Sequence, residues 1–143
     1  MTAATTSLAI CLLLLAGCAT TPSHDAQLRA MGVQAFGTDA NLKVHDIFYG
    51  GPGDSLSDAF DATTDVSAIA AHMKAAKSQN VDLVVSSSSS HLAAATILAA
   101  LRSPSLRGGL QQLRLLFVGT SEDAARLKPK VEATGAKFLF HEK

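Results

Sequence analysis

The stretch VDLVVSSSSSHLAAATILAALR, residues 81–102, decides the fold. It begins with an apolar run interrupted only by Asp82, a pattern typical of a strand that is covered on both faces. Five serines follow, and then an apolar segment of helical length that ends before Pro104. A buried strand, a polar turn and a helix form part of a βαβ unit, so we expect this stretch at the centre of a small parallel sheet.

Three further segments predict strands because they are short and rich in β-branched and aromatic residues. They are residues 43–49 (KVHDIFY), 114–118 (RLLFV) and 137–140 (KFLF). Helical spacing of apolar residues predicts helices over residues 64–78, over 91–102 and from Thr120 or Ser121 to Gly135. This alternation predicts an α/β fold, a small three-layer sandwich with a parallel sheet of about four strands and about three helices, similar to flavodoxin-like and Rossmann-like folds.

Finer details of the fold are also expected. Strands numbered along the chain should lie in the order 2-1-3-4, with the switch between the first and third strands. Residues 50–63 are expected to form a loop. Gly32 and Gly37 should confine any earlier helix to a short one at about residues 26–31, because glycine disfavours helix interiors.

Length and composition limit the class of protein. The chain has 143 residues, 48% hydrophobic and 17% charged, which suits one folded domain rather than a disordered chain. Acids and bases balance at twelve each, so no nucleic-acid partner is expected. The balance is uneven, with eight acids and four bases up to Asp82 and four acids and eight bases after it. This is either ordinary variation on solvated faces or a bipolar surface that orients the domain against a partner or a membrane.

The N-terminal residues resemble an export signal. Residues 7–16 (SLAICLLLLA) are too few to span a bilayer but typical of the apolar region of a signal peptide. The sequence LAGC that ends at Cys18 then resembles a bacterial lipobox, in which the cysteine is lipidated and becomes the mature N-terminus. The resemblance covers residues 1–18 only. It departs from the pattern in one respect, because MTAATT carries no positive charge.

This resemblance implies a division of the chain and a location. Residues 1–17 would be a signal peptide, residues 18–42 the lipid anchor, tether and weakly patterned lead-in, and residues 43–143 the α/β domain. Lipidated Cys18 would anchor the protein in the membrane. Ala19 stands where inner-membrane retention needs Asp, so the resemblance implies the outer membrane, with the domain facing the periplasm. The alternative is a hydrophobic N-terminal helix of a cytosolic protein.

The candidate site follows from the topology, since parallel α/β sheets bind ligands at the carboxyl ends of their strands. Four segments end there: GGPGDS at 50–55, SSSSSH at 86–91, GTSED at 119–123 and HEK at 141–143. The candidate ligand-binding residues are Asp54, Ser55, Ser87, Ser88, Ser89, Ser90, His91, Thr120 and Ser121.

The serine turn at residues 86–91 has two interpretations. Its hydroxyls, beside the free N–H groups of a helix N-terminus, suit a small anionic ligand. Alternatively, one serine caps the helix and the others bond to the loop backbone. A serine hydrolase could combine one of these serines with His91 or His141 and an acid, but no G-x-S-x-G motif surrounds them.

No cofactor and no metal are expected. The glycines at 50–53 match neither a phosphate loop nor GxGxxG. Asp54, Asp58 and Asp61 do not have EF-hand spacing. Cys11 and Cys18 form no CxxC pair.

These patterns favour a membrane-anchored periplasmic lipoprotein that is a binding or accessory component of the cell envelope. It would take a partner protein or a small anionic ligand, and it is not expected to be an enzyme. The alternative is a small serine hydrolase or a phosphate-ester-acting enzyme that uses the serine turn. A protein-binding role predicts an exposed apolar patch, with residues 92–101 as its place.

Overall fold

A four-stranded parallel sheet with the strand order β1-β2-β3-β4 organises the molecule. The computed structural model describes residues 21–47 and 55–143, with side chains in the helix that begins at Ser55 described from Thr63 onward. The strands are β1 (Leu42–Ile47), β2 (Val81–Ser87), β3 (Leu113–Gly119) and β4 (Lys137–Glu142). The expected small α/β sandwich is confirmed, with β2 in the interior of the sheet.

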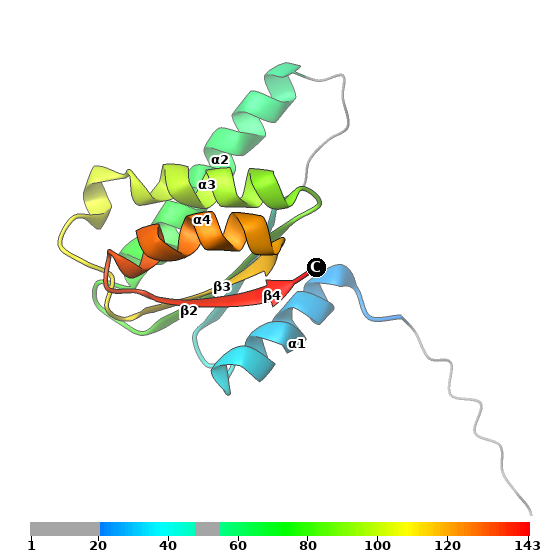
Figure 1. Ribbon diagram of the computed structural model, residues 1–143, viewed down its shortest axis with the longest axis horizontal. Coiled ribbons are helices and arrows are strands. Elements are labelled where there is room, and N and C mark those ends of the chain that lie inside the picture. The colour runs from blue at the N-terminus through cyan, green and yellow to red at the C-terminus, as the bar shows by residue number, and fades with distance from the viewer. Residues whose placement is uncertain (1–20, 48–54) are drawn as a thin grey trace, which may run out of the picture.

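The expected strand order 2-1-3-4 is wrong. Each strand pairs with the next along the chain, so that Val44 lies beside Val84, Val84 beside Leu116 and Leu116 beside Leu139. Successive βαβ crossovers of one hand, without a reversal of strand order, put their helices on the same face of the sheet. Figure 1 shows this arrangement. The helices are α2 (Ser55–Ala75), α3 (Ser90–Leu101) and α4 (Ser121–Glu132).

Helix α1 (His24–Phe36) covers the opposite face of the sheet (Figure 1). The expectation that Gly32 interrupts helices in this region is wrong, because Gly32 is buried where α1 crosses the sheet. A Cβ at this position would lie 2.8 Å from side-chain carbons of both Leu42 and Val84. Glycine therefore permits close packing here, whereas Gly37, with a φ of 75°, ends the helix in the left-handed conformation.

Helix α2 is longer than expected. It begins at Ser55, so the loop predicted over residues 50–63 is wrong from residue 55 onward, and residues 48–54 lie outside the described residues. Serine, threonine and aspartate disfavour helix interiors only weakly, so the helix continues through them. No helix in the described part of the chain is long and apolar enough to cross a membrane.

The sheet has a hydrophobic core on each face. Every residue of β2 is buried, which is the burial that its nearly continuous apolar run predicts. The larger core lies between the sheet and α2, α3 and α4, and its largest side chains include Met73, Leu83, Ile97, Phe117 and Leu127. The smaller core lies under α1 and contains Leu28, Phe36, Leu42, Val84, Leu116 and Val118.

Candidate functional site

The serine turn lies at the carboxyl edge of the sheet, where α3 and α4 begin side by side. Ser89 is the N-cap of α3, and its hydroxyl accepts a 3.3 Å hydrogen bond from the Leu92 N–H. Thr120 is the N-cap of α4, and its hydroxyl accepts from the Asp123 N–H at 3.4 Å. Side-chain caps of this kind satisfy backbone donors that have no partner within the helix.

A hydrogen-bond network joins the two helix N-termini. The Ser90 hydroxyl donates to the Asp123 carboxylate at 2.7 Å and accepts from the Thr120 N–H at 2.9 Å. The Thr120 hydroxyl donates to the same carboxylate oxygen at 3.1 Å. The Ser90 hydroxyl therefore has partners within the protein both as a donor and as an acceptor.

The remaining serines differ in their surroundings. The buried hydroxyl of Ser87 accepts from the Ser89 N–H at 3.1 Å. Ser86 is fully buried, and its hydroxyl has no hydrogen-bond partner among the described residues. Ser88 is exposed. The structure thus gives caps and backbone partners to three of the five serines, which supports the second interpretation of the turn.

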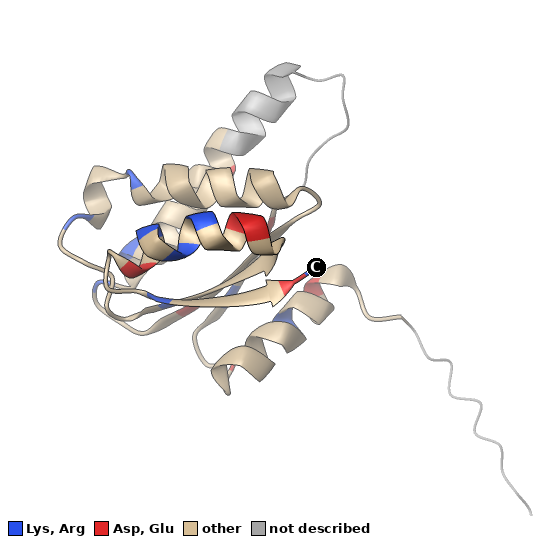
Figure 2. Ribbon diagram, viewed as in Figure 1, with Lys and Arg blue, Asp and Glu red and all other residues tan. Residues whose placement is uncertain are grey.

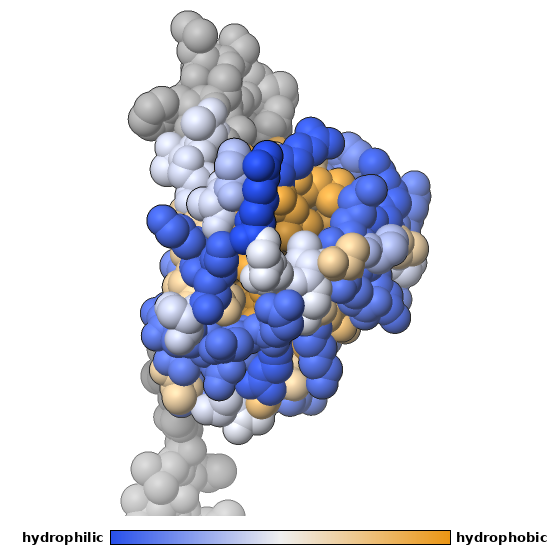
Figure 3. All heavy atoms as spheres, turned by 90° about the vertical axis from the view of Figure 1, so that its left-hand side faces the viewer, coloured by the Kyte–Doolittle hydropathy of each residue, from blue (hydrophilic) through white to orange (hydrophobic). Residues whose placement is uncertain are grey.

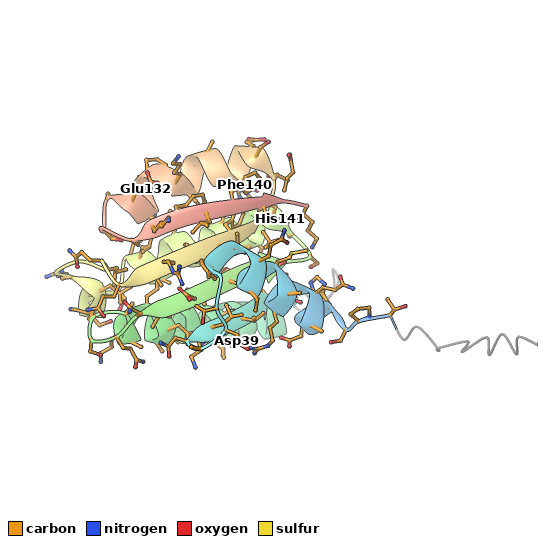
Figure 4. The ribbon with its side chains drawn as sticks, turned by 90° about the horizontal axis from the view of Figure 1, so that it is seen from below. Asp39, Glu132, Phe140 and His141 are labelled. Atoms are coloured by element: carbon orange, nitrogen blue, oxygen red, sulfur yellow. The ribbon has the colours of Figure 1, made fainter. Side chains whose placement is uncertain are left out.

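His91 does not contact the serine hydroxyls as a general base would. Its side chain is 70% exposed, and its Nδ1 lies 3.5 Å from the Asp123 carboxylate and 3.4 Å from an Arg126 nitrogen. His141 is on β4 and lines a groove with α1 residues such as Met31 and Gln34. Figure 4 shows α1 lying across one face of the sheet, with His141 and Phe140 on the edge strand β4. The described residues therefore hold no hydrogen-bonded Ser-His pair of the kind that activates a nucleophile.

Asp123 dominates the electrostatics of this edge. The hydrogen bond from Ser90 lowers the pKa of Asp123, burial opposes this effect, and Thr120 and His91 lower it further. The carboxylate is 9% exposed and lies in the first turn of α4, where a negative charge is favoured. Because Asp123 already supplies a negative charge here, a second anion is disfavoured on α4.

The other predicted site residues are placed as follows. Ser121 is the exposed first residue of α4. Ser55 is the first residue of α2, and its side chain lies outside the description, as does all of Asp54. Lys143 lies next to the serine turn, because its ammonium group donates to the Ser87 carbonyl at 2.9 Å.

A second polar cluster lies between β1 and α2 and was not expected from the sequence. His45 Nε2 lies 2.9 Å from an Asp65 carboxylate oxygen, and the ring of His72 lies 6.4 Å from the ring of His45. Burial lowers the pKa of His72, as do the nearby His45 and Lys43. The spacing of Asp65 and His72, two turns apart on one helix face, was the signal in the sequence. Within the described residues, no group of three or more such side chains could hold a metal ion.

Two grooves flank α3 on the outer surface of the helix layer. The groove between α3 and α4 has a volume of about 290 Å³ and is lined by Leu98, Leu101, Arg102, Lys130 and Thr134. The groove between α2 and α3 has a volume of about 480 Å³, and Arg102 lines it as well. Figure 3 shows a hollow of hydrophobic atoms between hydrophilic side chains on this end of the molecule.

The chain matches no family model, no curated protein sequence and no solved structure.

Proposed function

We propose that this protein is a lipoprotein that binds a partner protein in the cell envelope. Lipidated Cys18 would anchor it in the outer membrane, with the α/β domain in the periplasm. The LAGC sequence ending at Cys18 supports the anchor. The surface of the domain at α3 supports the binding role, because α3 carries no charged residue from Ser90 to Leu101 and a groove borders this helix on each side.

One observation favours a binding role over a hydrolase. The Ser90 hydroxyl donates to the Asp123 carboxylate at 2.7 Å, whereas His91 lies beside the other oxygen of that carboxylate at 3.5 Å. The acid thus lies between the serine and the histidine. A serine nucleophile needs the imidazole in that place, to accept the hydroxyl proton.

Cell fractionation of Cys18→Ala tests the anchor. We expect wild-type protein in the outer-membrane fraction and the variant in the soluble periplasm, because acyl chains supply about 0.8 kcal/mol of membrane affinity per buried methylene. Cys11→Ala is the matched control and should remain with the membrane. A Cys18→Ala variant that still sediments with membranes contradicts the lipoprotein proposal.

Labelling with a serine-reactive phosphonate tests the choice between binding and hydrolysis. We expect no labelling of Ser87, Ser88, Ser89 or Ser90 in the folded protein. Labelling of Ser90 that is lost in His91→Ala would contradict the binding proposal and favour the serine-hydrolase hypothesis.

A further inference from the structure

The groove between α3 and α4 combines apolar walls with positive charge. Leu98 and Leu101 of α3 are partly buried and line it from one side. Arg102 follows α3 directly, and Lys130 lies near the end of α4. The volume of about 290 Å³ has room for a leucine-sized side chain.

The charged residues that line this groove have one sign. Arg102 and Lys130 are exposed and form no ion pair among the described residues, and no acid lines the groove. Lys74 extends the positive charge to the groove on the other side of α3, which Arg102 also lines. Figure 2 shows Lys and Arg towards the ends of α3 and α4, and acids at the start of α4, at its last residue and at the end of β4.

The start of α1 and the groove lie at opposite ends of the domain. Helix α1 begins at His24, whose Nε2 lies 3.3 Å from the Asp46 carboxylate near the carboxyl end of β1. Five residues lie between Cys18 and His24 in the sequence, and a fully extended chain from one to the other spans about 20 Å. A lipid on Cys18 would therefore hold the carboxyl edge of the sheet near the bilayer. Figure 1 shows the C-terminal ends of α3 and α4 at the other end of the domain.

We infer that the groove between α3 and α4 docks an acidic amphipathic segment of an envelope protein. An apolar side chain of that segment enters between Leu98 and Leu101, and its carboxylates meet Arg102 and Lys130. Charge complementarity selects an acidic partner over a basic one. With a lipid on Cys18 near the start of α1, the groove would face away from the membrane, and the partner would reach it from the periplasm. The inference rests on the proposed binding role and specifies its partner.

Peptide binding to the full-length protein in lipid nanodiscs tests this inference. The probe is a synthetic peptide of about 15 residues, near the length at which isolated helices become stable, with leucine on one helical face and glutamate elsewhere. Fluorescence anisotropy should show binding that weakens as salt is raised, because exposed charges are screened. We expect the double variant Arg102→Glu/Lys130→Glu to bind the peptide at least about tenfold more weakly than wild type, since like charges then face each other.

Matched controls separate this groove from general attraction. The variant Arg29→Glu/Lys43→Glu makes the same change in net charge on α1 and β1 and should bind like wild type. A peptide with lysine in place of glutamate should not bind wild type. Equal binding by the groove variant, equal binding of the lysine peptide, or no binding of the acidic peptide would each overturn the inference.

The anchor and the groove can fail separately. Binding of the acidic peptide by the Cys18→Ala variant supports the groove, whether or not the fractionation experiment supports the anchor. A membrane-bound wild-type protein that ignores the peptide leaves the anchor intact and removes the groove. Sedimentation at the peptide-binding concentration tests a second copy as the occupant, and a dimer dissociated by Arg102→Glu/Lys130→Glu would contradict the proposed partner.

Discussion

The Ser90 hydroxyl donates a 2.7 Å hydrogen bond to Asp123, and this bond fixes the N-terminus of α3 against that of α4. Both residues lie in segments that the sequence marked as ligand-binding candidates. Their side chains instead satisfy each other across 33 positions of sequence. The edge of the sheet is therefore held together by groups that would otherwise be available to a ligand.

Asp123→Asn should destabilise the protein at neutral pH. The hydrogen bond from Ser90, with those from Thr120 and His91, lowers the pKa of the carboxyl group, so the folded protein binds this proton less readily than the unfolded chain. The stabilisation is complete above about pH 4, the ordinary range of aspartate, and is lost as the pH falls through the folded-state pKa. Urea unfolding at several pH values should show the difference between variant and wild type shrinking in acid. Glu122→Gln is the control, and an unchanged difference down to low pH would contradict the assignment.

Thr120→Ala should lower the free energy of unfolding by about 1 kcal/mol, the usual effect of removing an N-cap hydroxyl. The threonine hydroxyl accepts from the Asp123 N–H and donates to its carboxylate, and alanine leaves both groups without this partner. Thr120→Ser keeps the hydroxyl and should retain most of the stability. Chemical denaturation measures both variants, and equal losses would argue against the cap.

Gly32→Ala should destabilise the protein by about 1–3 kcal/mol, the usual range for overpacking a core. Alanine favours helices, so an effect on α1 alone would have the opposite sign. The added methyl group would lie 2.8 Å from Leu42 and Val84, which forces α1 away from the sheet. Thermal unfolding distinguishes the two effects, with the exposed Gln34→Ala as the control. A stabilised Gly32→Ala variant would contradict the close packing.

Removing Arg114 should destabilise the protein more than removing it together with its partner. Arg114 donates two 2.6 Å hydrogen bonds to the buried Asp82, donates to the Phe36 carbonyl at 3.2 Å and lies over the Phe36 ring. Arg114→Met leaves Asp82 buried and unpaired, which costs about 3–5 kcal/mol in a dry site and less here because Arg114 is partly exposed. Asp82→Leu/Arg114→Met removes both charges and should recover part of the loss. A double-mutant cycle measures the coupling, and additive losses would contradict it.

The structure bears out the elements of the fold that depend on local pattern. The run at residues 81–85 is a buried strand because an apolar segment followed by a capped helix has few other solutions in a small α/β domain. The helix predicted to begin at Thr120 or Ser121 is α4, and Thr120 is its N-cap. Strand order was not predictable, because the pairing of β1 with β2 depends on side chains that meet across the sheet and leaves no local mark.

The candidate site was likewise predicted only in part from the sequence. Its position at the carboxyl edge followed from the alternation of strands and helices. The use of its groups did not, because Ser90, Thr120 and Asp123 belong to separate segments that meet only when α3 and α4 pack together. The exposed apolar patch predicted over residues 92–101 is wrong, because the large hydrophobic side chains of α3 are buried or partly buried. The cations beside α3 come from its own C-cap, Arg102, and from the ends of α2 and α4.

The sequence by itself determined the strand–helix alternation, the capped start of α4 and the apolar character of α3, since each depends on neighbouring residues. Only the tertiary structure decided which hydroxyls remain exposed and why Gly32 lies within a helix. It also placed α2, α3 and α4 on one face and α1 on the other. The physical reason is that hydrogen-bond partners and close contacts are set by distances between segments that are remote in the chain.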